Sequence, residues 1–410
     1  MIGRRCLFVL SLATLLNGCV LGTRLPPPPD LINDAAPVGF GPDIRLVSVD
    51  RARFIQRLPQ WFSGLRRAAG DRPLNVLVLS GGGANAAFGA GALVGLSDRH
   101  ARPEYQLVTG VSAGALLAPF GFLGSAWDAQ LEKAFAGEGI EHLQRAIKWG
   151  AFEHALFPRS ARSHDPLARL IRKTYSDAMI DEVGREYAKG RELVIATTDL
   201  DRQETVLWNM GAIAAHGGNA AHELFRQVLV ASASVPGAFP PVLIRVREGN
   251  DVFDELHVDG SVTTPLFFGP LIASTVPGVR EELAGANLYV VIDGALAMEP
   301  KKTSVGSLSV LTHSFSAQIT YKTRDALTLI LDDTRRNQMQ FLMTEIPTGY
   351  PAGSYLDFSR GHLRQLFEYG ETCAQQGHLW TTPEQSIHRN LRPRQADITQ
   401  GNACPAAKVQ

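Results

Sequence analysis

Gly110-Val111-Ser112-Ala113-Gly114 is a Gly-x-Ser-x-Gly motif between an apolar run, Leu107–Thr109, and a run of small and apolar residues, Ala115–Ala118. This order predicts a strand, a sharp turn and a helix, the arrangement of a nucleophile elbow. Glycines are expected on both sides of the turn because a Cβ there would clash with the adjoining strand and helix. The turn would hold the Ser112 hydroxyl clear of a sheet, at the positive end of a helix. By itself the motif also fits a glycine-lined turn without chemistry.

The composition is that of an ordinary globular protein. The chain has 410 residues, of which 45% are hydrophobic and 20% charged, and its 40 basic and 40 acidic side chains give a formal net charge of zero. This length suffices for one large domain or two modest ones. A nucleic-acid-binding protein would need a basic surplus, so we expect no nucleic-acid partner.

The first residues resemble a bacterial export signal. A pair of arginines precedes Cys6–Leu16, an apolar run of signal-peptide length that is too short to span a bilayer as a helix. Leu16-Asn17-Gly18-Cys19 resembles a lipobox, in which a small residue precedes a cysteine that is lipidated and becomes the first residue of the mature protein. We therefore expect a signal peptide at residues 1–18 and a lipid on Cys19. An ordinary signal peptide cleaved nearby is the alternative.

Residues 19–73 are predicted to be a lipidated tether and a lead-in helix. Pro26–Pro29 is typical of a stiff, extended tether. Val20, rather than Asp, follows the cysteine, and by resemblance to bacterial sorting rules this favours anchoring in the outer membrane. Apolar residues at three- and four-residue spacing between Phe54 and Leu65 predict a short amphipathic helix. We expect it to pack on the core, with a membrane-facing role as the alternative.

The sequence contains two further cysteines, Cys373 and Cys404, outside the signal and the lipidation site. In an oxidising periplasm, two cysteines left in one C-terminal region are expected to form a disulfide. The alternative is a pair of buried free thiols.

A glycine run follows the first strongly apolar stretch of the chain. Leu74–Leu79 predicts a buried parallel strand, Ser80-Gly81-Gly82-Gly83 follows it, and Ala84–Leu96 predicts a helix. A nucleotide-binding loop has the same order of elements. However, the lysine of a P-loop is missing, and Ala86 stands where the dinucleotide fingerprint needs glycine. A nucleotide-binding α/β domain is therefore the weaker alternative.

We interpret the glycine run as an oxyanion hole. The backbone amides of Gly81, Gly82 and Gly83 would point into a cleft and stabilise negative charge on a substrate carbonyl oxygen. This strand–loop–helix unit and the one that holds Ser112 are spaced like neighbouring parallel strands of a βαβ repeat. Both loops would then lie at the carboxyl edge of the sheet, where open α/β sheets bind ligands.

Acidic residues follow several later strands. Phe253–Val258 is followed by Asp259-Gly260-Ser261, and Asn287–Ile292 by Asp293-Gly294. Asp199 and Asp201 follow another apolar run, and we interpret them as turn residues rather than metal ligands.

Four blocks in one order resemble the patatin-like phospholipase family, over about residues 74–294. They are Gly81–Gly83, the motif around Ser112, the Ala233-x-x-Pro236-x-x-Phe239-Pro240-Pro241 stretch and Asp259-Gly260. The resemblance implies an α/β fold, a three-layer α/β/α sandwich with a mainly parallel sheet. It also implies a catalytic domain at residues 74–294, and we expect residues 295–410 to form a helical extension packed on it.

The resemblance implies a Ser-Asp dyad. Ser112 would attack an ester carbonyl to give an acyl-enzyme, Asp259 would accept the serine proton, and water would release a fatty acid. The substrate would be a phospholipid or another acyl ester, with neither cofactor nor metal required. Asp293 is expected to be structural. A triad through His257 is a weaker alternative, because His257 and Asp259 would both have to point one way along one strand.

Two positions depart from the family pattern. The family usually has Arg or Lys two positions after the triple glycine and then Gly, but here they are Asn85 and Ala86. The missing positive charge is expected to weaken stabilisation of the oxyanion or of an anionic head group. Ser261 stands where Gly or Ala is usual, and we expect little consequence from so small a residue.

The sequence therefore predicts a serine lipid acyl hydrolase anchored to the bacterial envelope, in the outer membrane. The alternative is a catalytically silent envelope lipoprotein that serves as a lipid- or protein-binding scaffold. The presence of both Ser112 and Asp259 favours the enzyme.

Overall fold

The structure is a computed structural model of the chain. It describes residues 24–28, 35–47, 51–137, 143, 165–268, 276, 278–296, 302–303, 305–347, 350, 353–386 and 404–406. The expected signal peptide and Cys19 lie outside these residues.

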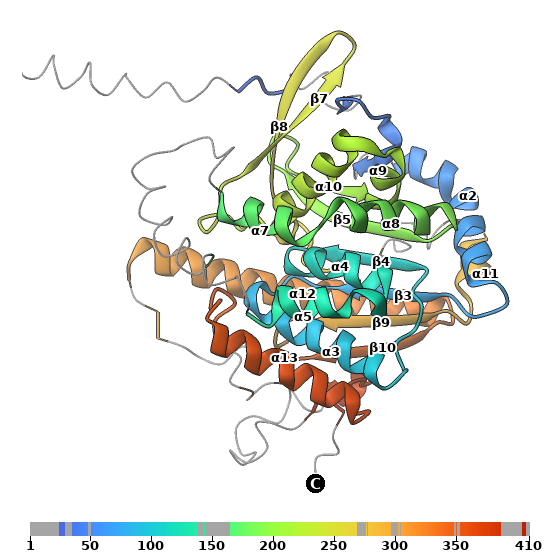
Figure 1. Cartoon of the computed structure of the whole chain (residues 1–410), viewed down its shortest axis with the longest axis vertical. Helices are drawn as coiled ribbons and strands as arrows, with labels where there is room; N and C mark the ends of the chain where they lie inside the picture. Colours follow the sequence, from blue (N-terminus) through green and yellow to red (C-terminus); the bar gives the residue numbers. More distant parts are fainter. Residues whose placement is uncertain are drawn as a thin grey trace, which may run out of the picture.

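The described strands form one ten-stranded sheet. They are β1 (Ala36–Pro37), β2 (Arg45–Val47), β3 (Asn75–Leu79), β4 (Leu107–Val111), β5 (Glu192–Asp199), β6 (Glu204–Asn209), β7 (Val242–Glu248), β8 (Asp251–Asp259), β9 (Asn287–Ile292) and β10 (Gln340–Glu345). Their order is β1-β7-β8-β5-β4-β3-β9-β10, with β6 beside β5 and β2 beside β6. The run from β5 to β10 is parallel, and β7 and β8 form an antiparallel hairpin that extends from the sheet (Figure 1).

Helices cover both faces of the sheet. They are α2 (Arg51–Ala69), α3 (Ala86–Asp98), α4 (Ala113–Leu123), α5 (Asp128–Phe135), α7 (Pro166–Thr174), α8 (Asp177–Ala188), α9 (Met210–His216), α10 (Gly218–Ser232), α11 (Val279–Leu283), α12 (Ser307–Arg336) and α13 (Arg360–Gln375). Short 3-10 turns are η1 (Pro42–Ile44), η2 (Gly83–Asn85), η3 (Ser125–Trp127) and η4 (Gly260–Val262). In Figure 1, α4 and α5 lie in front of the sheet and α12 passes behind it.

The core consists of two hydrophobic clusters, which β3 separates. Leu77 and Leu79 belong to the cluster that includes α3, α4, α5, α7 and α13, whereas Val76 and Val78 belong to the cluster with α2, α11 and α12. Side chains alternate between the two faces of a strand, so a strand buried on both faces is apolar throughout. The predicted three-layer α/β/α sandwich is confirmed.

The pairing of β5 brings the ends of β4 and β8 together. On one edge of β5, β6 pairs with residues 194–199, so β4 and β8 must share the other edge. On that edge β4 pairs with β5 as far as Val111, which lies opposite Ala196. At the next residue of β5, Thr197, the partner is Asp259, the last residue of β8. Because β8 runs antiparallel to β5, its carboxyl end meets the carboxyl end of β4. This register places residue 259 beside the residues that follow Val111.

The lead-in helix α2 packs on the core, as predicted. Leu58, Phe62 and Leu65 are buried in the cluster on the α12 side of the sheet. None of the described helices combines the length and hydrophobicity that a membrane-spanning segment needs.

The C-terminal region is more than a helical extension. Its strand β10 pairs in parallel with β9 and extends the sheet, which corrects the expectation of helices alone. The helix α13 packs closely against α3, where a Cβ on Gly91 or Gly370 would collide with the backbone of the other helix. The structure joins Cys373 of α13 to Cys404 in a disulfide, with Cα atoms 5.3 Å apart.

Candidate active site

Ser112 lies in the turn between β4 and α4, with φ 56° and ψ −126°. A positive φ is uncommon for a residue with a side chain and indicates a strained turn, which is frequent at active sites. A Cβ on Gly110 would lie 2.5 Å from the Gly114 carbonyl oxygen, and one on Gly114 would collide with the Ser80 carbonyl. The predicted strand, sharp turn and helix, with glycine required on both sides, are therefore confirmed.

Ser232 supports the turn from α10. The Ser112 amide donates a hydrogen bond to Ser232 Oγ at 3.0 Å, and Ser232 Oγ donates to the Ala196 carbonyl at 2.7 Å. This hydroxyl thus ties the elbow to β5. No local sequence pattern predicts this contact, because Ser232 belongs to a helix distant along the chain.

Ser112 and Asp259 are hydrogen-bonded to each other. Ser112 Oγ donates to Asp259 Oδ2 at 2.6 Å, and the Ser261 amide donates to Asp259 Oδ1 at 2.8 Å. The Asp259 side chain is fully buried. Burial raises the pKa of Asp259 to about 6, although the hydrogen bonds from Ser112 and Ser261 act in the opposite direction. The carboxylate is therefore ionised at neutral pH but more basic than an ordinary aspartate.

The glycine loop Gly81–Gly83 adjoins Ser112. A Cβ on Gly81 would lie 3.2 Å from the Cβ of Ser112. The Gly81 amide, however, donates to the Pro265 carbonyl at 3.1 Å. This corrects the predicted oxyanion hole of three amides. Of the three glycines, Gly82 and Gly83 have amides that donate no hydrogen bond to the described residues.

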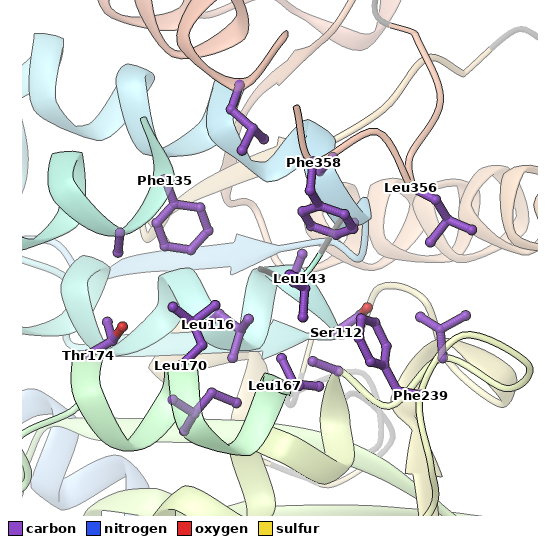
Figure 2. A pocket seen from close by; sticks show the side chains of 18 of the residues that line it. Ser112, Leu116, Phe135, Leu143, Leu167, Leu170, Thr174, Phe239, Leu356 and Phe358 are labelled. Carbon is purple, nitrogen blue, oxygen red and sulfur yellow. The ribbon is translucent and has the colours of Figure 1, made fainter. Parts of the chain in front are cut away.

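An apolar cavity extends from Ser112 (Figure 2). Figure 2 shows Phe239, Leu356 and Phe358 around the Ser112 end, whereas Thr174 lies at the opposite end. Other lining residues are Gly83, Ala84, Ala113, Leu116, Ala134, Phe135, Leu143, Leu167, Leu170, Ile171, Tyr175, Ala233, Val235 and Leu363. An apolar cavity with few polar groups at one end is typical of a small-molecule site.

Asp293 lies at the end of β9 and adjoins Gly82 of the glycine loop. Its Oδ1 accepts a hydrogen bond from the Gly89 amide at 3.2 Å, and its own amide donates to Ser80 Oγ at 3.0 Å. Burial raises the pKa of Asp293 well above its ordinary value, although the hydrogen bond from the Gly89 amide acts in the opposite direction. These contacts join β9 to α3 and β3, and they agree with the structural role predicted for Asp293.

His257 is engaged away from Ser112. Its Nδ1 lies 3.0 Å from Thr197 Oγ1 and its Nε2 lies 3.3 Å from Glu255 Oε2. Both ring nitrogens thus have partners on the β5–β8 pair. The geometry gives no support to a triad through His257.

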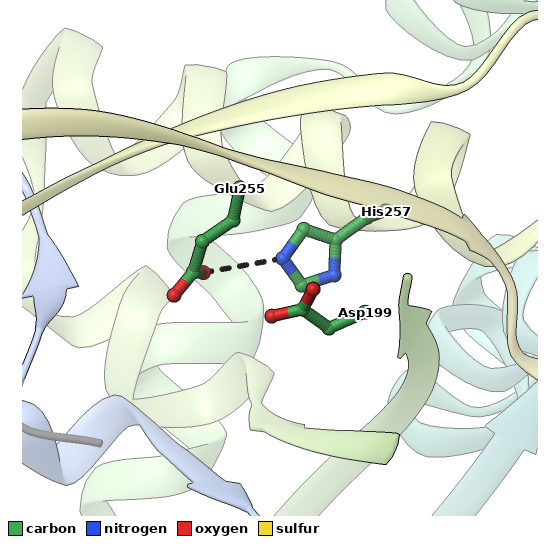
Figure 3. A group of neighbouring side chains, drawn as sticks. All are labelled: Asp199, Glu255 and His257. Carbon is green, nitrogen blue, oxygen red and sulfur yellow. Dashed lines mark hydrogen bonds and ion pairs between the residues drawn. The ribbon is translucent and has the colours of Figure 1, made fainter. Parts of the chain in front are cut away.

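Asp199, Glu255 and His257 form a buried cluster with ligand atoms within 4.8 Å of one another (Figure 3). Such a set could hold a metal ion, but two guanidinium groups already neutralise it. Arg45 pairs with Glu255, while Arg202 lies 3.1 Å from Asp199 Oδ2 and 3.2 Å from Glu255 Oε1. The cluster is therefore an ion-pair network.

The charges in this network fix the state of Glu255. Burial alone would raise the pKa of Glu255, but the charge of Arg45 and the hydrogen bonds from His257 and Arg45 outweigh it and lower the pKa to about 2. Asp199 Oδ1 also accepts hydrogen bonds from the Asp201 and Arg202 amides, at 2.9 and 3.3 Å. Asp199 thus acts as the turn residue that was predicted.

Residues 77–272 match the family model described as patatin-like phospholipase. Comparison with curated proteins finds no match. Similar solved structures include VipD from Legionella pneumophila, with 14% identity and a TM-score of 0.32, over 78% of this chain and 70% of that one. Human GIVD cytosolic phospholipase A2 has 12% identity and a TM-score of 0.33, over 86% of this chain and 66% of that one.

A further match is the complex of full-length SpcU with full-length ExoU, from the type III secretion system of Pseudomonas aeruginosa. It has 16% identity and a TM-score of 0.28, over 78% of this chain and 53% of that one. The chain thus spans from about half to 70% of the length of these matched chains. Likenesses this weak add nothing to the family match. Residues 77–272, which contain both Ser112 and Asp259, therefore form a domain of the patatin-like phospholipase family.

Proposed function

We propose that this protein is a serine lipid acyl hydrolase, of phospholipase A or esterase type, that uses Ser112 and Asp259 as a catalytic dyad. The family match supports lipid hydrolase activity. The observation that carries the finer proposal is the 2.6 Å hydrogen bond from Ser112 Oγ to Asp259 at one end of an apolar cavity. A nucleophile within hydrogen-bond reach of a base is the arrangement that covalent catalysis needs.

In the first half-reaction Ser112 Oγ attacks the ester carbonyl carbon while its proton passes to Asp259. The carbonyl π electrons move to the oxygen, and a tetrahedral oxyanion results. When this intermediate collapses, the ester C–O bond breaks, and Asp259 returns the proton to the leaving alcohol. In the second half-reaction water attacks the acyl-enzyme, Asp259 accepts the proton of that water, and the proton returns to Ser112 Oγ as the fatty acid leaves.

The oxyanion would be stabilised by backbone amides. Gly82 and Gly83 keep amides without a hydrogen bond among the described residues. Ala113 follows the nucleophile and lines the cavity, and its amide, in the first turn of α4, has no acceptor within the helix. Losing one such donor costs about 10²–10³ in rate.

The cavity favours an acyl chain as the bound group. Its walls beyond Ser112 are aliphatic and aromatic side chains, and no charged side chain is among its described lining residues. Burying each methylene group of a chain contributes about 0.8 kcal/mol. The substrate would be a phospholipid or another acyl ester, with the alcohol outside the cavity.

We also propose that Cys19 anchors the protein to the bacterial outer membrane through a lipid. Support comes from the sequence around Cys19, and the disulfide between Cys373 and Cys404 fits an oxidising compartment. Incorporation of radiolabelled palmitate by the wild type and its loss in Cys19→Ser would bear this out. A wild type that takes up no palmitate would refute the anchor.

The hydrolase is tested by fatty-acid release from phosphatidylcholine vesicles and from nitrophenyl octanoate. We expect turnover by the wild type, and a loss of at least about 10³-fold in Ser112→Ala and Asp259→Asn. Asp293→Asn is the matched control, because it changes another buried aspartate to its neutral isostere, and it should stay active. If the wild type releases no fatty acid from either substrate, the silent scaffold is favoured. Loss in Asp293→Asn but not in Asp259→Asn would exchange their roles.

A further inference from the structure

The cavity wall is completed by a segment outside the matched family domain. Residues 353–359, here called the wall segment, precede α13 in the C-terminal region. Leu356 and Phe358 of this segment line the cavity together with Ser112, and Figure 2 shows them at the Ser112 end. Both side chains are half-buried.

The wall segment is bonded to the glycine loop. The Ala84 amide donates to the Tyr355 carbonyl at 2.8 Å. Gly83 has φ +58°, and a Cβ there would collide with the same carbonyl, so the two backbones touch. Burial and the negative charge of Asp259 raise the pKa of Tyr355 to about 12, which keeps its phenol neutral. The segment is therefore held directly over the loop that adjoins Ser112.

Helix packing fixes this position. The helix α3 begins at Ala86, after the short turn η2 that starts at the end of the glycine loop, and α13 begins directly after the wall segment. The two helices pack with their backbones in contact at Gly91 and Gly370. The glycine loop and the wall segment thus each precede one helix of a closely packed pair, and this packing fixes the distance between them.

We propose that Leu356 and Phe358 are specificity-determining residues, which with Phe239 narrow the cavity beside Ser112 so that it admits an unbranched acyl chain and rejects a branched one. This inference rests on the proposed hydrolase function. Branching next to the carbonyl would place methyl groups against these two side chains, because both line the cavity at the Ser112 end. The preferred substrates would be esters of straight-chain fatty acids.

The experiment measures kcat/KM for nitrophenyl octanoate and nitrophenyl pivalate, whose acyl group is branched next to the carbonyl. Phe358→Ala and Leu356→Ala should raise the pivalate-to-octanoate ratio by about 10-fold or more, the discrimination typical of a methyl-sized difference. Phe358→Leu keeps much of the apolar bulk and should restore most of the wild-type ratio. Thermal unfolding of each variant shows that it is folded, and Leu356→Ala carries the test if Phe358→Ala does not fold.

Phe341→Ala is the matched control. Phe341 is a half-buried phenylalanine of β10 that packs in the cluster on the other face of the sheet, so its removal should leave the ratio unchanged. If the wild type is active and both Phe358→Ala and Leu356→Ala keep its pivalate-to-octanoate ratio, the specificity role is overturned. The proposed hydrolase function would be unaffected by that result. A wild type that hydrolyses neither ester would overturn both proposals.

Discussion

Asparagine in place of Asp259 is expected to make the protein more stable while removing the proposed base. The pKa of an ordinary aspartate is 3.8, whereas burial raises the pKa of Asp259 to about 6. At neutral pH the ionised carboxylate therefore opposes folding, and the difference in pKa corresponds to a free energy on the order of 2 to 3 kcal/mol. Asparagine has nearly the same shape and no charge, so it should recover most of this free energy.

The sign of the effect fixes its pH dependence. Because the pKa is higher in the folded protein, the contribution of Asp259 to stability is fully present below about pH 4 and is lost as the pH rises through about 6. The advantage of Asp259→Asn should therefore be absent in acid, grow between these values and reach its full size at neutral pH.

Urea unfolding of both proteins, followed by tryptophan fluorescence at several pH values, measures this difference. Asp251→Asn is the matched control, since Asp251 is exposed at the start of the same strand and its replacement should change stability little. If Asp259→Asn were no more stable than the wild type at neutral pH, or if its advantage persisted unchanged in acid, the argument from burial would fail.

Three other outcomes follow from the same contacts. For hydrolysis, kcat/KM should rise with pH through a limb near pH 6, because Asp259 must be ionised to accept a proton; a flat profile over that range would contradict the assignment. Arg45→Ala should lower the free energy of unfolding by about 2–3 kcal/mol, because the buried Glu255 carboxylate loses a partner that lies 3.0 Å away and keeps only Arg202 and His257; a loss below about 1 kcal/mol would refute this. Ser232→Ala should lower kcat with little change in KM, because the Ser112 amide loses its acceptor; unchanged kinetics would show that the elbow needs no such support.

Local chemistry made the elbow and the parallel part of the sheet predictable. Gly110 and Gly114 are needed by a turn that the flanking strand and helix patterns predict, and residues 76–79 of the buried strand β3 are an unbroken apolar run. The choice of Asp259 over Asp293 depends on its distance after Pro240-Pro241 and on the Thr-Pro turn that follows it, and both criteria come from the resemblance to the family. The pairing of β8 with β5 explains why Asp259 lies beside Ser112. Strands that pair from distant parts of the chain leave no local pattern in the sequence.

The missed features all depend on contacts between distant segments. The Gly81 amide bonds to Pro265, Arg45 of the tether region pairs with Glu255, and Leu356 reaches the cavity from the C-terminal region. The strand β10 is short, and at the sheet edge only its second half is buried, so its apolar pattern is weak. Such features require the tertiary fold before they can be recognised.

The central claim is that Ser112 is an activated nucleophile, and covalent labelling tests it most directly. The folded protein is exposed to a fluorophosphonate, digested, and its peptides are weighed by mass spectrometry. Our account predicts one adduct, on Ser112, that is absent from Ser112→Ala and forms much more slowly in Asp259→Asn. A wild type that takes up no label, or that carries the label on a residue other than Ser112, would contradict it.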